Sequence, residues 1–267
     1  MQRFMLIAML AVSFFAVSSA WAYSYTIKDN YWGADDHDYK DVIAADEDVE
    51  NFNIKKMEVG FSGHESMTVK VYTPFTEDIA GYGTKYGDLF ISTNGWNPQG
   101  TAADNYQSDN AGTGEVWEYV FDTSAGQAGQ AGQAGQAGQA GQAGQAGQLF
   151  QIDDDTVLTL AEDAPPQNGG SDYIVRDGQE VLYESGGNEI VGDRSTFSDV
   201  DKGDFLKYVI DLSSLDITGD SIGLKWSMTC ANDSIEGSVP VPAPEPSTML
   251  LLGSGLIGLA FYRRRKK

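Results

Sequence analysis

Residues 67–72 read Met-Thr-Val-Lys-Val-Tyr, and this alternation of apolar and polar side chains decides the fold class. Successive side chains of a strand point to opposite faces, so the three apolar residues at odd-numbered positions would line one buried face. The segment therefore predicts a half-buried strand of the kind found in antiparallel sheets.

Other short segments share high apolar or aromatic content and flanking Gly, Asn or Asp residues. They are residues 52–61, 89–91, 116–121, 149–152, 156–160, 173–175, 180–183, 205–212 and 222–230. No 12-residue window of the body shows a convincing apolar period of 3.6. The pattern predicts an all-β domain over residues 23–239, an antiparallel two-sheet sandwich, with a concanavalin-like jelly roll as the specific expectation.

A low-complexity tract interrupts this body. Residues 125–148 are eight consecutive Ala-Gly-Gln triplets, which offer little apolar surface to bury and no charge. The tract is expected to be disordered. Because neither flanking half has enough strands to close a sandwich alone, we expect an insertion at the tip of one hairpin.

The N-terminus has the three parts of a secretory signal peptide. A basic Arg3 precedes an apolar run from Phe4 to Val17, and Ala20-Trp21-Ala22 forms an A-x-A cleavage site. We expect residues 1–22 to form a signal helix that the Sec translocon admits and signal peptidase removes after Ala22.

The C-terminal segment, residues 240–267, also has three parts. Pro244, Glu245 and Pro246 lie in a proline-rich stretch that disfavours helix. A short apolar stretch follows, for which we expect a single membrane helix at about 247–262. Five cations then end the chain and would hold it on the cytoplasmic side: Arg263, Arg264, Arg265, Lys266 and Lys267.

This order of parts resembles the PEP-CTERM sorting signal of Gram-negative bacteria. The resemblance implies recognition by an exosortase-type membrane protease and processing near Pro244-Glu245-Pro246. It also implies an inner-membrane intermediate, final residence at the cell surface or outside the cell, and association with exopolysaccharide or biofilm. An ordinary single-pass anchor is the alternative. The resemblance covers only the end of the chain and leaves the activity of the body open.

Charge and cysteine content limit the partners of the body. Residues 23–262 hold 11 basic and 39 acidic residues, a net charge of −28. Such a body repels nucleic acid and anionic lipid, so neither is an expected partner. With Cys230 alone, no intramolecular disulfide can form, and stability must come from a hydrophobic core.

Catalytic patterns are absent from the sequence. There is no G-x-S-x-G motif, and no Glu-x-Asp pair of the kind that sandwich glucanases carry on one strand. Glu115 and Glu118 flank Trp117 on an expected strand, where a separation of three would place them on opposite faces. We therefore expect no enzyme and no cofactor, although a carboxylate pair from distant strands stays open.

Two kinds of binding residue remain. Aspartate clusters suit calcium, and Asp199, Asp201 and Asp204 are the candidate ligands of a structural Ca²⁺ ion, with solvated acidic loops as the alternative. Trp96, between Asn-Gly and Asn-Pro, is the best candidate for stacking on a sugar ring. The sequence thus predicts a non-catalytic surface or matrix protein, with a lectin-like module as the alternative and a glycoside hydrolase as the less favoured one.

Overall fold

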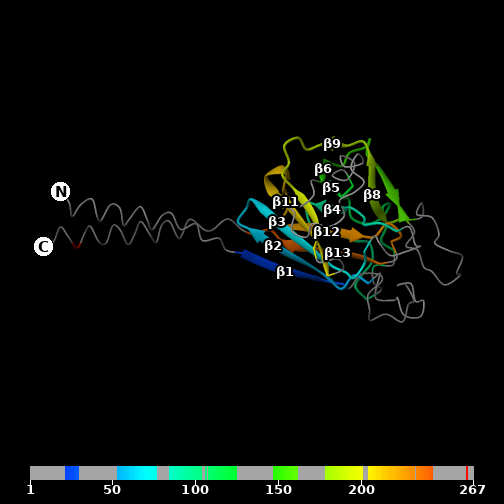
Figure 1. The fold of residues 1–267 in the computed structure, drawn as a ribbon, viewed down its shortest axis with the longest axis horizontal. Helices are drawn as coiled ribbons and strands as arrows, with labels where there is room; N and C mark the ends of the chain where they lie inside the picture. The colour runs from blue at the N-terminus through cyan, green and yellow to red at the C-terminus, as the bar shows by residue number, and fades with distance from the viewer. Residues whose placement is uncertain are drawn as a thin grey trace, which may run out of the picture.

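The computed structural model describes residues 22–29, 53–76, 84–103, 106, 108–124, 147–161, 178–200, 204–231, 233–242 and 263. The described body is all-β with antiparallel sheets, as expected, and Figure 1 shows its arrangement. In chain order the strands are β1 (Ala22–Lys28), β2 (Lys56–Ser62), β3 (Ser66–Tyr72), β4 (Leu89–Ser92), β5 (Tyr119–Asp122), β6 (Gln148–Gln151), β7 (Val157–Leu160), β8 (Glu180–Ser185), β9 (Asn188–Glu189), β10 (Thr196–Val200), β11 (Phe205–Asp211), β12 (Ser221–Ser227) and β13 (Ser234–Pro240). A 3₁₀ turn, η3 (Leu212–Ser214), follows β11.

The alternating segment at residues 67–72 lies in the middle strand of a five-stranded sheet. Its strand order is β1-β2-β3-β11-β10. In β3 the side chains of Met67, Val69 and Val71 are fully buried, and those between them are half-buried. The predicted alternation is therefore confirmed, and β2 and β11 repeat it.

A six-stranded sheet, of order β13-β12-β4-β5-β6-β9, packs against the first. One hydrophobic cluster takes buried side chains from both sheets. Trp226 of β12 donates from Nε1 to the hydroxyl of Tyr208 of β11 at 2.8 Å and so ties the sheets across the core. This arrangement fits the predicted two-sheet sandwich.

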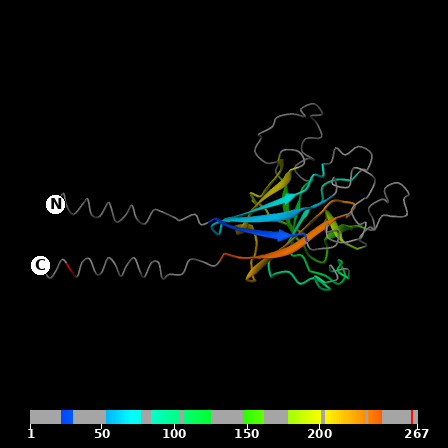
Figure 2. The same ribbon diagram turned by 90° about the horizontal axis from the view of Figure 1, so that it is seen from below.

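Strands β1 and β13 lie side by side where the two sheets meet (Figure 2). A Cβ atom on Gly237 would lie 2.6 Å from Cγ2 of Ile27, so glycine permits this close approach. The start of β1 and the end of β13 lie at the same end of the body in Figure 2.

A small two-stranded sheet, β7-β8, covers part of the outer face of the six-stranded sheet. Tyr183 of β8 stacks on Phe150 of β6 with ring centroids 4.2 Å apart. A second hydrophobic cluster forms beneath this cover, around Phe90, Trp117 and Val120. Part of the outer face of the six-stranded sheet is therefore buried as well, whereas β9 at its edge is exposed.

Several predicted strand boundaries were wrong. The segment 116–121 becomes strand only from Tyr119, and 222–230 ends as strand at Ser227. Strands β1, β10 and β13 were not predicted, because Ala22–Lys28 adjoins the expected cleavage site and β13 contains Gly237 and ends in Pro240. Residues 173–175 lie outside the described residues.

Strands β5 and β6 pair antiparallel, with Asp122 opposite Gln148. The repeat tract therefore joins two neighbouring strands, and its last residue belongs to β6. The rest of the tract, apart from Gly147, lies outside the described residues, as do the expected signal helix before Ala22 and the expected membrane helix. Among the described residues, no helix has the length and apolar character needed to cross a bilayer.

Candidate functional site

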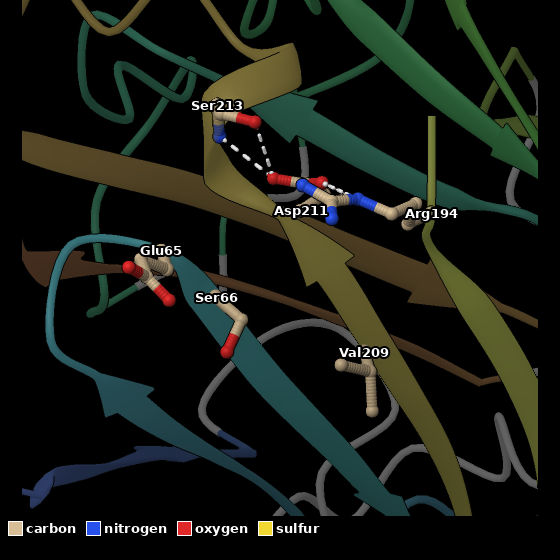
Figure 3. Close-up of a pocket in the computed structure, with 6 residues that line it drawn as sticks. All are labelled: Glu65, Ser66, Arg194, Val209, Asp211 and Ser213. Carbon is tan, nitrogen blue, oxygen red and sulfur yellow. Dashed lines mark hydrogen bonds and ion pairs between the residues drawn. The ribbon is translucent and has the colours of Figure 1, made fainter. Parts of the chain in front are cut away.

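A hollow of about 490 Å³ opens on the outer face of the five-stranded sheet (Figure 3). The residues that line it are Glu65, Ser66, Arg194, Val209, Asp211 and Ser213. Asp211 caps η3 by accepting from the backbone N of Ser213 at 3.0 Å and from its Oγ at 2.6 Å. Arg194 donates to the other oxygen of Asp211 at 3.1 Å.

These contacts define the chemistry of the hollow. The hydrogen bonds from Ser213, together with Arg194, hold the pKa of Asp211 below its usual value. The side chain of Arg194 is 82% exposed, so its guanidinium can also meet an anion from solvent. Asp211 itself is committed to the turn as an ionised cap.

Trp96, the predicted sugar-stacking residue, lies over the outer face of the six-stranded sheet. Its indole Nε1 donates to Oε2 of Glu236 on β13 at 3.0 Å, and its ring meets that of Tyr106 edge-on at 5.1 Å. The side chain is half-buried and packs against the second hydrophobic cluster. Trp96 therefore anchors a loop, and only part of its ring faces solvent.

Beneath Trp96 lies a buried charge cluster that no sequence pattern indicated. Lys225 of β12 donates from Nζ to Glu180 at 2.5 Å and to Gln179 at 2.8 Å, and lies 3.4 Å from Glu236. The side chain of Lys225 is 1% exposed. Phe90 belongs to its surroundings, with the ring centroid 6.0 Å from Nζ.

The cluster is held together by compensation of charge. Burial raises the pKa of Glu236, and the neighbouring Lys225 ammonium opposes that rise. One buried cation thus faces two buried carboxylates from different strands. Because Glu180 belongs to β8 and Glu236 to β13, the cluster fastens the covering β7-β8 sheet onto the six-stranded sheet.

The predicted placement of Glu115 and Glu118 on opposite strand faces was wrong. Both precede β5, and both carboxylates accept hydrogen bonds from the loop after β4. Glu115 accepts from Ser92 Oγ at 3.0 Å and from the backbone N of Asn97. Glu118 accepts from the backbone N of Thr93 at 2.8 Å and from Asn94 Nδ2 at 2.7 Å.

Burial raises the pKa of Glu115, and the charge of Glu118 adds to that rise. The structure therefore brings two carboxylates to one loop, where the sequence spacing had suggested separation. Their hydrogen bonds from backbone N–H groups give both the role of loop anchors. The sequence signal for this arrangement is the run Thr93-Asn94-Gly95. It is typical of a turn, whose backbone N–H groups need hydrogen-bond acceptors.

The predicted calcium ligands are only partly described. Asp199 accepts from the hydroxyl of Tyr86 at 2.9 Å, and Asp204 is exposed in the turn before β11. Asp201 lies outside the described residues. Within the described ranges, no group of three or more His, Cys, Asp or Glu side chains has the geometry of a metal site.

The predicted processing residues fall mostly outside the described residues. Ala22 is the first residue of β1, paired with Ser62, so the expected cleavage would fall within the start of that strand. Ala20 and the Pro244-Glu245-Pro246 motif are not described, and of the five terminal cations only Arg263 is, as an exposed residue.

Comparison with known families gave one match. Residues 242–266 match the model of the PEP-CTERM protein-sorting motif. The matched range contains Pro244, Glu245 and Pro246 and all but the last of the terminal cations. No curated protein and no solved structure matches the chain. The chain carries the C-terminal PEP-CTERM sorting signal of exosortase substrates, which makes it a secreted protein that an exosortase membrane protease processes and that is destined for the cell surface.

Proposed function

We propose that the body is a non-catalytic structural protein of the cell surface or extracellular matrix that associates with exopolysaccharide. The sorting signal at residues 242–266 carries this proposal, because it delivers the body to the compartment where such polymers lie. The route includes a signal peptide cut after Ala22 and an inner-membrane intermediate held by the C-terminal helix in a Gram-negative cell. The body itself would be a concanavalin-like jelly roll.

The contacts of four glutamates favour a body without catalytic activity. A general acid or nucleophile has to reach a substrate, whereas Glu180 and Glu236 face Lys225, and Glu115 and Glu118 anchor a loop. All four side chains are engaged in contacts within the protein. Their engagement favours a structural body over a glycoside hydrolase.

The test separates sorting from association. We expect the processed protein to co-fractionate with extracellular polysaccharide from producing cells, and to appear free in the medium of cells that make no polysaccharide. Replacing Pro244-Glu245-Pro246 by alanines should leave an unprocessed, membrane-bound form. Free protein in the medium of both strains would overturn the association, and a reducing-sugar assay with sustained turnover would overturn the non-catalytic assignment.

A lectin-like module is the second candidate, favoured by the half-buried Trp96 beside Tyr106. Retention on purified polysaccharide that is lost in Trp96→Ala but kept in Trp96→Phe would support sugar stacking by the ring. Equal retention of both variants would reject it. A structural Ca²⁺ ion at Asp199, Asp201 and Asp204 stays part of the proposal, and the melting temperature with and without a chelator tests it.

A further inference from the structure

Four lysines share one half of the outer face of the five-stranded sheet. Lys28, Lys56, Lys70 and Lys207 belong to β1, β2, β3 and β11, at positions that alternate with buried residues. We call this half the lysine face. Among the described residues in the two register rows that hold these lysines, Glu58 is the one carboxylate.

The lysines are paired against each other across the strands. Lys28 lies directly opposite Lys56, and Lys70 lies directly opposite Lys207. Like charges at such positions destabilise a sheet. The body has far more acidic than basic residues, so opposite charges were available for these positions. An anion bound between the ammonium groups would turn each repulsion into attraction, which gives the arrangement a use.

Aromatic rings lie beside the charges. The ring centroids of Tyr72 and Phe205 are 5.3 Å apart, and both side chains are half-buried. Lys56 Nζ lies 4.4 Å from the Tyr72 centroid, and Lys70 Nζ lies 4.9 Å from that of Phe205. The face therefore combines cations with flat apolar surface. An acidic sugar complements both features, because it carries carboxylates and apolar C–H faces.

Glu58 contacts two side chains of the lysine face. It accepts from Lys56 Nζ at 2.6 Å and from the Tyr72 hydroxyl at 2.7 Å. Its one negative charge offsets only one of the four lysines. The face is thus a net cationic patch on a body of net charge −28.

We propose that the lysine face binds an anionic polysaccharide and that the carboxylate groups of the polysaccharide contact the lysines. This proposal rests on the proposed function and names the class of polymer. The four lysines span three strand spacings of about 4.8 Å each, or about 14 Å, so the ligand is an extended chain. The surrounding negative potential opposes the approach of any polyanion, so binding depends on carboxylates that align with the lysines.

The position of the face agrees with this role. Lys28 ends β1, whereas Ala22 begins it at the end of the body where β13 finishes (Figure 2). The cations therefore lie away from the end where the chain leads to the sorting motif. A second copy of this acidic chain is the competing occupant. Such a copy would need only the charge of the lysines, whereas the paired aromatic rings suit the C–H faces of a sugar.

Binding of polygalacturonate, with neutral dextran as the reference polymer, tests the proposal on the full-length chain purified in non-ionic detergent. We expect binding to polygalacturonate that weakens with salt, and no binding to dextran. The double variant K70Q/K207Q should raise the dissociation constant about tenfold, as expected for the loss of two charge contacts. Because the two lysines repel each other, the variant should keep its melting temperature.

The matched control is K55Q/K85Q, which removes two exposed lysines outside the face. It should change the dissociation constant less than about twofold. Equal losses in the two variants, no binding of polygalacturonate, or equal binding of dextran would each overturn the proposal. So would a dimer in sedimentation that K70Q/K207Q abolishes without polygalacturonate binding. Co-fractionation with the producer's own polysaccharide would still stand in these cases, so the proposed function fails only on its own test.

Discussion

The two sheets of the body both carry lysine on their outer faces, in opposite surroundings. On the six-stranded sheet, Lys225 is buried under β8 and a loop and faces two carboxylates. On the five-stranded sheet, Lys70 and Lys207 are half-buried and lie opposite each other, and the neighbouring Glu58 is bonded to Lys56. The lysine of the covered sheet forms buried ion pairs, whereas the lysines of the open sheet remain accessible to a ligand. Burial, and not residue type, decides the role.

Removing the buried cation should cause the largest change in stability. Lys225→Met leaves Glu180 and Glu236 buried without their partner, and we expect a loss of about 3–5 kcal/mol in the free energy of unfolding. Urea denaturation of the full chain measures it. The triple variant K225M/E180Q/E236Q, which removes the carboxylates too, should recover part of the loss. A change below about 1 kcal/mol in K225M would show that the cluster does not hold the cover.

The buried Asp88 should make the stability of the covered sheet depend on pH. It accepts from the backbone N of Tyr183 on β8 and of Thr123, both at 2.8 Å, and burial raises its pKa to about 7. The folded carboxyl thus holds its proton at pH values where the unfolded one has lost it. Stability from this group is present at low pH and falls as pH rises through 7.

The expected fall is about 3 kcal/mol between pH 4.5 and 7.5, relative to Asp88→Asn. Denaturation at the two pH values in both proteins measures it. The nearby Asp122 adds to the pKa rise, so Asp122→Asn should reduce the fall without removing it. Parallel pH profiles of parent and Asp88→Asn would contradict the prediction.

The repeat tract between β5 and β6 tests how much the covered sheet depends on its connections. Shortening eight triplets to one halves the length of the tract three times. The lower entropic cost of closing the loop should stabilise the protein by at most about 2 kcal/mol. We expect the melting temperature to change by only a few degrees. A large loss of stability would mean that the tract packs on the body.

The lysine face should give the smallest change in stability. K70Q/K207Q removes a like-charge pair, so the free energy of unfolding should stay constant or rise by about 0.5 kcal/mol. The gain should shrink at high salt, where the parent's repulsion is already screened. A destabilisation above about 1 kcal/mol would show that these lysines support the fold, and would remove the contrast with Lys225.

The site was only partly predictable from the sequence. Trp96 was identified as an aromatic in a polar loop, but its hydrogen bond to Glu236 joins residues 140 positions apart and has no local signal. Lys225 stands between apolar residues of β12 at an outward position, which reads as a solvated lysine. It is buried because Gln179 and Glu180, 46 and 45 positions earlier in the chain, lie over it.

The all-β class and the sorting route could be predicted from local sequence. Alternation in residues 67–72 is a local property, and the sorting signal at 242–266 is a linear motif, so neither needs a folded neighbour to be read. Which lysines are buried, and which lie opposite each other, depends on the folded arrangement of the strands. Strand register and the covering β7-β8 sheet set those distances, and both arise from contacts between segments far apart in the chain.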